Sequence, residues 1–482
     1  MALDPASGKN LYLQLADVVA GQIEAGTYGP GDRIPSVRKL KDQYRVSLTT
    51  VLEACRVLED RGLVTARAQS GHYVRTRSPA RRSEPEESRP TTGATRVDAS
   101  LAVKLNLGIG NPQEPTLGAA VQGPELMAIG PLNRLLGHVL RHQPAACHSY
   151  DAPPGSAALR RSIARRGGDA GYDVSADDIV ITRGAKEAVY LSIGAVTKAG
   201  DTVAIESPAY YALLEVLSSL GLRALEIASH PRHGINLDDL ARALESQPVA
   251  AVALVSNFSN PTGSCMTDAA KRRLVGLLEA ADVPLVEDDV YGDLVYEGRR
   301  PSAIKAFDSR GLVLYCSSYS KTLSPGLRVG WAIPGRYQNE VELLKLVVNQ
   351  ATAVAPQLAL AAFLDSGGCD RHIRKVRAMY GDQMASMIDA VERHFPASTR
   401  LTRPQGGHVL WVQLPAGVDA MDLYDDADRS GIRIAPGPMF SPSHGYRNFI
   451  RLNTGFPWSE TTERQMTTLG RLVAERVGSG GV

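Results

Sequence analysis

The chain has 482 residues, of which 44% are apolar and 22% charged, and its net charge is +2. This composition is that of an ordinary soluble globular protein and excludes the collagen-like, disulfide-rich and disordered classes, while the length allows two or three domains. No apolar run approaches the roughly 20 residues of a membrane-spanning helix, so no membrane partner is expected.

The N-terminus and the cysteines both favour a cytoplasmic protein. Residues 1–5 lack the basic start and apolar core of a signal peptide. The cysteines are dispersed, without the paired spacing of a disulfide framework or a zinc site: Cys55, Cys147, Cys265, Cys316 and Cys369. We therefore expect reduced thiols and no metal site.

Residues 1–77 predict a first domain that begins with three helices. Apolar residues recur at helical spacing over residues 11–23. Ser36 is a suitable N-cap for a second helix over residues 37–44, and Ser47 for a third that follows. Residues 1–78 also carry a small excess of basic over acidic side chains, which is compatible with a domain that meets phosphates.

A short hairpin is predicted after the third helix. The helix closes at Arg61–Gly62, where glycine suits the left-handed position after a helix end. Residues 63–66 and 72–75 can then pair as two strands around residues 69–71. Three helices and such a wing make a winged helix-turn-helix.

Three motifs in this domain closely resemble the GntR family of bacterial regulators: Gly31–Leu40, Val46–Val51 and Gly62–Val64. The resemblance implies contacts to double-stranded DNA from Arg38, Ser47, Thr49, Thr50 and Gly71. Short hydroxyl side chains and free amides at a helix N-terminus can approach phosphates and base edges. One position departs, because Leu48 stands where the family often has a base-reading arginine. The alternative is a small helical domain for protein contacts.

Residues 78–103 are rich in proline, serine and mixed charge and show no apolar period. Such a composition predicts a flexible linker. From residue 104 to residue 482, short apolar strands alternate with helical stretches, and polar motifs follow the strands. This pattern predicts an α/β domain with its ligand site at the strand ends.

The most informative motif of this second domain is Ser317–Trp331, which follows the apolar run Leu312–Tyr315. Lys321 lies there in a turn rich in serine, glycine and proline, where a lysine can form an imine with an aldehyde cofactor. Its spacing from Ser318 alone also fits acyl-transferring serine enzymes.

The motifs that precede Lys321 occur in a fixed order: Gly184–Lys186, Ser207–Tyr210, Asn257–Gly263 and Glu287–Tyr291. This series resembles the pyridoxal-phosphate aminotransferases of the aspartate aminotransferase fold. The resemblance implies fold type I over residues 104–482, with a mixed, mostly parallel sheet, flanking helices and a smaller C-terminal subdomain. It also implies pyridoxal 5′-phosphate as cofactor.

The same resemblance assigns a role to residues around the cofactor ring. Lys321 would carry the imine, and Asp288 would keep the pyridine nitrogen protonated. The neighbouring acids Glu287 and Asp289 leave a one-residue error open. Asn260 and Tyr291 would hydrogen-bond the phenolic oxygen, and Tyr210 would stack on the ring.

The phosphate, the partner subunit and the effector account for the remaining assignments. Gly184, Ala185 and Lys186 would offer a helix N-terminus to the phosphate, with Ser318, Ser320 and Arg328 beside it. Tyr150 matches a tyrosine that reaches the neighbouring subunit's cofactor, which implies a homodimer. Arg451 matches the arginine that binds a substrate carboxylate.

A GntR-type head joined to an aminotransferase-like body is identified as the architecture of the MocR subfamily. The resemblance implies a dimeric regulator that binds a DNA operator and responds to an amino compound or to pyridoxal phosphate. The alternatives are an active aminotransferase whose head only tethers it, and a protein that senses pyridoxal phosphate alone. A transamination assay separates the first alternative from the regulator.

Overall fold

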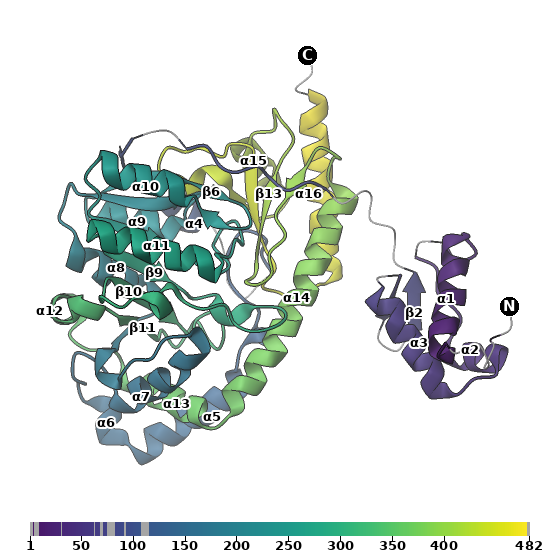
Figure 1. Ribbon diagram of the computed structural model, residues 1–482, viewed down its shortest axis with the longest axis horizontal. Coiled ribbons are helices and arrows are strands. Elements are labelled where there is room, and N and C mark those ends of the chain that lie inside the picture. Colours follow the sequence, from purple (N-terminus) through teal and green to yellow (C-terminus); the bar gives the residue numbers. More distant parts are fainter. Residues whose placement is uncertain are drawn as a thin grey trace. The chain divides into compact units, whose positions relative to one another are not determined.

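The computed structural model describes residues 3, 9–29, 31–61, 63–67, 71–74, 82–90, 93–107 and 115–479. The chain divides into two compact units, residues 1–81 and residues 82–482. We call them the head and the body and describe each by itself (Figure 1).

The head has the three helices and the hairpin predicted from the sequence: α1 (Leu11–Glu24), α2 (Val37–Tyr44), α3 (Leu48–Asp60), β1 (Val64–Arg67) and β2 (Gly71–Val74). The Ser36 hydroxyl caps α2 by accepting from the Lys39 amide, and the Ser47 hydroxyl caps α3 by accepting from the Thr50 amide. Gly62, Gln69, Ser70 and Arg75, used in the prediction of the wing, lie outside the described residues.

One apolar core holds the head together. It draws Leu15 and Val19 from α1, Leu40 from α2, and Val51 and Leu58 from α3, all at most 2% exposed. The residues before α2 also pair with β2 on the edge away from β1, because the Ile34 amide donates to the His72 carbonyl at 3.0 Å. Because Val51 and Leu58 are buried in this core, the side of α3 that faces outward is fixed.

The body is built on a mixed sheet whose strands run in the order β3-β6-β5-β8-β9-β10-β11-β4, with β7 beside β6. The pairs from β6 to β10 are parallel, and β3, β11, β4 and β7 are antiparallel to their neighbours. Their bounds are β3 (Thr95–Arg96), β4 (Val180–Thr182), β5 (Thr202–Ser207), β6 (Arg223–His230), β7 (Gly234–Ile235), β8 (Ala251–Leu254), β9 (Leu285–Asp288), β10 (Val313–Ser318) and β11 (Gly330–Ile333). The predicted fold class is confirmed.

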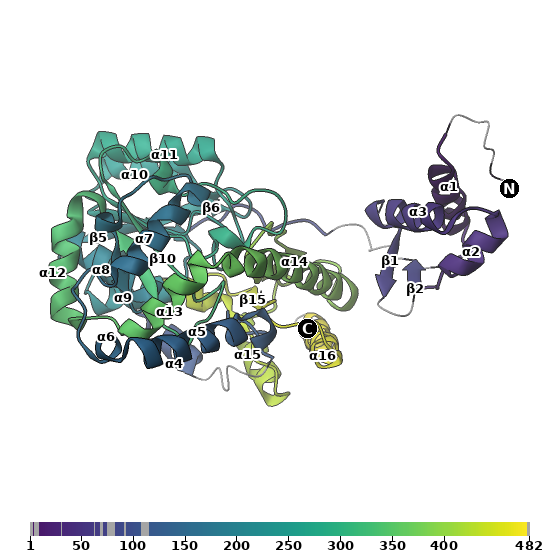
Figure 2. The ribbon, with the colours of Figure 1, turned by 90° about the horizontal axis from the view of Figure 1, so that it is seen from below.

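Helices cover both faces of this sheet, as expected for strands that are apolar on both sides (Figure 1 and Figure 2). One face carries α8 (Ala185–Val196), α9 (Tyr211–Ser219) and α12 (Gln338–Asn349). The other carries α7 (Ala157–Arg166), α10 (Leu237–Ser246), α11 (Asp268–Ala281) and α13 (Val354–Asp365). The remaining helices of this part are α4 (Ser100–Leu107), α5 (Ile129–His142) and α6 (Pro144–His148).

A smaller C-terminal subdomain has an antiparallel sheet of its own, in the order β12-β13-β15-β14. Its strands are β12 (Arg400–Leu401), β13 (Val409–Gln413), β14 (Ala435–Pro436) and β15 (Phe449–Asn453), and its helices are α15 (Ala420–Arg429), α16 (Glu460–Ser479) and the long α14 (Gly368–His394). Helix α14 packs on α13 near its start and on α16 and β13 further along. It therefore joins the two subdomains.

The prediction of a flexible linker over residues 78–103 is wrong for residues 82–90, which we call the strap. Arg82 donates to the carbonyls of Glu392, Phe395 and Pro396 at the end of α14. The Ser88 hydroxyl donates to the Ser207 carbonyl at 2.6 Å. Further bonds join Glu84 to Arg232, Glu86 to Arg400 and Glu87 to Asn236. The polar and charged residues that suggested a linker thus form specific bonds to residues of both subdomains.

Residues 93–103, also assigned to the linker, contain regular structure. Strand β3 extends the large sheet by pairing with β6, and α4 begins at Ser100. The local sequence has no clear apolar period, so only the edge of the sheet shows that this segment belongs to the body. None of the described helices is long and apolar enough to cross a membrane.

Candidate functional site

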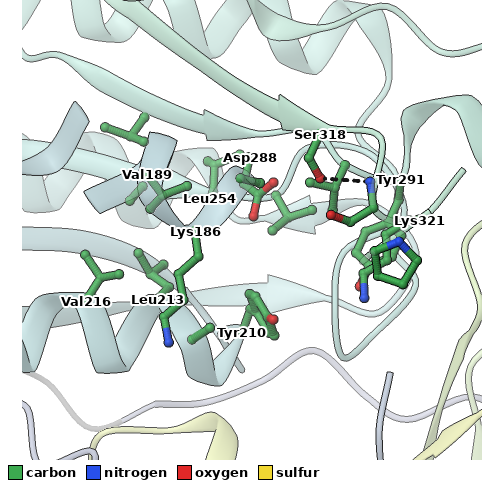
Figure 3. A pocket seen from close by; sticks show the side chains of 18 of the residues that line it. Lys186, Val189, Tyr210, Leu213, Val216, Leu254, Asp288, Tyr291, Ser318 and Lys321 are labelled. Carbon is green, nitrogen blue, oxygen red and sulfur yellow. Dashed lines mark hydrogen bonds between the residues drawn. The ribbon is translucent and has the colours of Figure 1, made fainter. Parts of the chain in front are cut away.

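A pocket of about 230 Å³ opens at the carboxyl ends of β8, β9 and β10. Nine of the residues predicted to bind cofactor line it: Ala185, Lys186, Tyr210, Asp288, Tyr291, Ser318, Ser320, Lys321 and Arg328. Figure 3 shows Asp288, Tyr291, Ser318 and Lys321 on one side of the cavity and Tyr210 and Lys186 on the other. Parallel strands bring these residues together because their ends meet at one edge of the sheet.

Lys321 reaches the pocket from the turn after β10, and its amine donates to the Ala120 carbonyl at 2.6 Å. Burial, together with the positive charges of Arg451 and Arg328, lowers the pKa of Lys321 to about 8, although the charge of Asp288 acts in the opposite direction. A neutral amine is the nucleophilic form of lysine. A larger fraction of Lys321 is therefore neutral near pH 7 than of an exposed lysine, whose pKa is about 10.5.

The three consecutive acids of β9 and its end have separate surroundings. Glu287 accepts from the Ser256 hydroxyl and from backbone amides, so it is a structural group. Asp289 forms an ion pair with Arg300, whose side chain is 7% exposed. Asp288 alone lines the pocket. Burial, aided by the charge of Asp289, raises the pKa of Asp288 to about 7. The structure thus distinguishes the three acids that the sequence left open.

Asn260 and Arg451 lie next to each other but are not among the residues that line the cavity. The Arg451 guanidinium, 0% exposed, donates to the Asn260 side-chain oxygen at 3.2 Å and to the Gly118 carbonyl. Burial raises the pKa of Tyr291, so its hydroxyl stays protonated and can donate. Tyr210 lies at the start of α9 with its ring 4.9 Å from that of Tyr211.

The opposite end of the pocket is a cradle of backbone and hydroxyl groups at the N-terminus of α8. Gly184 has a φ of +89°, and a Cβ atom there would lie 2.6 Å from the Arg328 guanidinium. Arg328 donates to the Arg183 carbonyl at 2.8 Å, and the Ser320 amide donates to the Ser318 hydroxyl at 3.3 Å. The Lys186 ammonium instead pairs with Glu215, so only its backbone position favours an anion.

Tyr150 is not brought to the pocket of its own chain. It lies just after α6, and its side chain is 82% exposed. Its predicted role needs a second copy of the chain.

Sequence reasoning missed His408, which is fully buried. Its Nδ1 lies 3.1 Å from the Asn453 side-chain oxygen, and its ring lies 5.4 Å from that of Tyr291. Burial, with the charge of Lys321 close by, lowers the pKa of His408 to about 3, so it is neutral. The only local signal was its place after Gly406–Gly407, before β13.

The predicted DNA-binding residues lie on α2, at the start of α3 and at the start of β2. Arg38, Ser47 and Thr49 are exposed, and Thr50 is partly buried. The hydroxyls of Ser47 and Thr50 are 2.7 Å apart, so both take part in capping α3. Gly71 has a φ of +109° and lies against the guanidinium of Arg33. Arg33 is a basic residue of the wing region to which the sequence analysis gave no role.

The pocket fits pyridoxal phosphate in its chemistry. Among the described residues, the buried polar atoms at or beside it that have no hydrogen-bond partner include Asp288 Oδ1, Asn260 Nδ2 and Arg451 Nε. These are an acceptor for a ring N–H, a donor for a phenolic oxygen and a donor for a carboxylate. Unpartnered buried groups are rare in proteins, and their cost is offset when a ligand pairs with them.

Two families match this chain. Residues 11–74 match the bacterial regulatory proteins of the gntR family, and residues 102–463 match aminotransferase class I and II. The match to the second family covers well over half of the chain, and this body is therefore an aminotransferase-type domain.

Relatives with both domains are similar over nearly their whole length. The transcriptional regulators YjiR and YdcR of Escherichia coli, both described as uncharacterized and of HTH type, are each 37% identical. The match covers 96% of this chain and 98% of YjiR, and 97% of this chain and 99% of YdcR.

A solved structure supports the assignment of the cofactor. The α-aminoadipate aminotransferase LysN of Thermus thermophilus, complexed with N-(5′-phosphopyridoxyl)-L-leucine, is 27% identical with a TM-score of 0.73. The match covers 80% of this chain and 97% of that one. With a GntR-type head and an aminotransferase-type body whose cofactor is pyridoxal 5′-phosphate, the chain belongs to the MocR subfamily of GntR-type transcription regulators.

Proposed function

We propose that this regulator binds a two-part DNA operator through a pair of heads and that a small amino compound, or pyridoxal phosphate itself, changes that binding from the pocket around Lys321. The observation that supports this most strongly is the pocket itself. It combines the reactive Lys321, the unpartnered Asp288 and the cradle at the N-terminus of α8, which we call the anion cradle, in a chain that has a DNA-binding head. A ligand shifts such an equilibrium only if it binds one state better than the other.

In the pocket, each residue acts on a defined part of the bound molecules. Pyridoxal phosphate, when bound, supplies an aldehyde that reacts with amines and a ring that withdraws electrons. Lys321 holds the aldehyde carbon, Asp288 the ring nitrogen, and Asn260 and Tyr291 the phenolic oxygen. Tyr210 covers the ring face.

The phosphate is bound at one end of the pocket, and the effector lies beside the pocket, toward Arg451. The anion cradle holds the phosphate with Gly184, Ala185, Lys186, Ser318, Ser320 and Arg328. Arg451 holds a carboxylate of the effector, since its Nε has no partner among the described residues. An amino acid or related amino carboxylate has the two groups, amine and carboxylate, that this arrangement suits.

The protein acts as a homodimer through the body, and Tyr150 reaches the cofactor of the partner. A tyrosine that is 82% exposed in one chain contributes little to the stability of that chain. We therefore expect Tyr150→Ala to leave thermal unfolding unchanged yet weaken cofactor binding about tenfold. Sedimentation should give the mass of two chains, and unchanged cofactor affinity in Tyr150→Ala would contradict the shared site.

The strap connects the pocket to the chain that leads into the head. Ser88 donates to the carbonyl of Ser207, three residues before Tyr210, and accepts from the Ser229 amide at 2.7 Å. We therefore expect a shift of Tyr210 to displace Ser88 and with it the strap. Five cysteines without disulfide partners are in keeping with a cytoplasmic place of action.

Ser88→Ala should uncouple the two sites while leaving each one intact. Coupling energies between sites are typically about 1–3 kcal/mol, or 5- to 150-fold in affinity, and we expect this change to remove most of that response. The measurement is DNA affinity with and without the amino compound. Ser309→Ala, an exposed serine elsewhere in the body, is the matched control and should respond as the unaltered protein does.

The test of the whole proposal crosses the two sites. Operator DNA is first found by footprinting and then titrated with the protein in several salt concentrations. Arg38→Ala should weaken binding about tenfold and leave the visible spectrum unchanged. Lys321→Ala should bind DNA but lose its response to amines. Arg374→Ala, an exposed arginine of the body, serves as control.

Two results would reject the regulator. One is the absence of specific DNA binding, and the other is binding that no amine and no pyridoxal phosphate alters. The slope of log K against log salt should be about −0.9 for each phosphate neutralised. If the protein instead turns over amino acids with a keto acid while ignoring DNA, the intact pocket belongs to an aminotransferase with a tethering head.

A further inference from the structure

The outward face of α3 carries two adjacent apolar side chains. Leu48 is 49% exposed and Leu52 is 50% exposed, and they are the large apolar residues that are exposed among the described residues of the head. Four residues apart on a helix, they lie side by side. A different face of α3, with Val51, Ala54 and Leu58, is buried in the core of the head, so the two leucines are left on the exposed side of the helix.

Basic residues border this face. The exposed charged side chains of α2, of the turn before α3 and of the start of α3 are mostly basic: Arg38, Lys39, Lys41, Arg45 and Arg56, against the acids Asp42 and Glu53, of which Glu53 pairs with Arg56. This excess of positive charge suits the phosphate backbone of DNA. The occupant that fits an apolar ridge between cations is the major groove of DNA.

Only one base offers an apolar group in that groove. Thymine presents its C5 methyl group, whereas the other three bases present hydrogen-bond donors and acceptors. A leucine has neither donor nor acceptor, and residues in the first turns of a recognition helix are the ones that meet base edges. We propose that Leu48 and Leu52 read the C5 methyl groups of thymines in each half of the operator.

The proposal rests on DNA binding by the head and adds its sequence preference. The two leucines are about 6 Å apart along the helix axis, which corresponds to about two base-pair steps of 3.4 Å. Each half-site should therefore contain two thymines within about two steps of one another. Thr49 lies next to Leu48 on the exposed face and can add a hydrogen bond.

The test removes the methyl groups alone. Full-length protein with pyridoxal phosphate bound selects its sites from a random duplex pool, and each thymine of the selected site is then replaced singly by deoxyuridine. At two positions in each half-site, affinity should fall about fourfold, the equivalent of about 0.8 kcal/mol for one buried methyl group. At the remaining thymines the change should have no effect.

The protein side of the test uses single substitutions. Leu48→Ala and Leu52→Ala should each lose the difference between thymine and uracil at one position and keep it at the other. Because both side chains are half-exposed, the fold of the head should be retained, which thermal unfolding checks. Leu48→Met should preserve the difference, since its side chain is also apolar. Leu343→Ala, 66% exposed on α12, is the matched control and should change neither ratio.

Two outcomes would overturn the inference. Equal affinity for thymine and uracil at every position would mean that no methyl group is read. A difference that persists in both alanine variants would mean that other residues read it and that the leucines face another protein. In both cases the protein still binds DNA, whereas a failure to select any site would reject the regulator itself.

Discussion

The Lys321→Ala protein is expected to be colourless and to hold no covalently attached pyridoxal phosphate. Lys321 is the lysine whose amine lies in the pocket with a lowered pKa and no acidic ion-pair partner within hydrogen-bonding distance among the described residues. Without it, cofactor is retained only through the anion cradle and the ring contacts. The measurement is visible absorption together with the mass of the protein after borohydride reduction.

Lys186 provides the matched control for this experiment. It lines the same pocket, but its ammonium pairs with Glu215. Lys186→Ala should therefore keep the mass increase that reduction fixes, although its affinity for the phosphate can fall. Retention of a reducible linkage in Lys321→Ala would move the reactive lysine elsewhere and refute the assignment.

The pH dependence of cofactor uptake follows from the same pKa. The pKa of Lys321 lies at about 8, below the usual 10.5, because burial disfavours the charged form. As pH rises toward 8, the fraction of neutral, reactive amine therefore increases about tenfold per pH unit, and above pH 8 it levels off. The initial rate at which cofactor-free protein gains visible absorption should show this rise between pH 6 and pH 8.

Asp288→Ala should lose affinity for the cofactor, whereas Asp289→Ala should lose stability. Asp288 faces the pocket with an unpartnered oxygen, and its removal would leave a buried cationic ring without its counter-charge. Breaking a buried ion pair costs about 3–5 kcal/mol, so we expect pyridoxal phosphate affinity to fall roughly 150- to 5,000-fold. The temperature of thermal unfolding of the cofactor-free protein should not fall.

The sign of the pH effect supports this expectation. The pKa of Asp288 is raised from 3.8 to about 7 by burial, so the folded state binds this proton more tightly than the unfolded chain does. Stability contributed by this group therefore falls as pH rises from about 4 to about 7. Asp288→Asn should remove that loss and stabilise the cofactor-free protein above pH 7.

Asp289→Ala leaves the Arg300 guanidinium buried without its main counter-charge. The free energy of unfolding should fall by about 3–5 kcal/mol, as measured in denaturant without cofactor. If Asp289→Ala were stable and lost the cofactor while Asp288→Ala bound it normally, the ring nitrogen would have to be assigned to Asp289.

Local sequence determined the elements and their chemistry. Ser36 and Ser47 precede apolar stripes at helical spacing, and a side chain that caps a helix acts within three residues. The strands of the body could be predicted for a similar reason, because runs such as Val252–Val255 are apolar on both faces. Lys321, Arg328 and the acids of β9 followed from ordered motifs.

What the sequence alone left open concerned groups whose neighbours are distant in the chain. Glu287, Asp288 and Asp289 are consecutive carboxylic acids with similar chemistry. They are distinguished only by what the fold brings to each of them, which is Ser256, the pocket and Arg300 respectively. His408 could not be recognised because its partner Asn453 comes from another strand of the small sheet. The neutral state of His408 depends on burial first and on the nearby charges of Lys321 and Arg451, none of which the local sequence shows.

The strap is the clearest case in which tertiary structure decided. Residues 82–90 have no apolar period and by composition resemble a linker, yet they are bonded to residues more than a hundred positions away. A segment held by hydrogen bonds and ion pairs to distant groups leaves no local signal, because the energy that orders it comes from partners the segment itself does not contain. The sequence by itself determined the two domains and the cofactor chemistry, and only the folded body decided where the second domain begins.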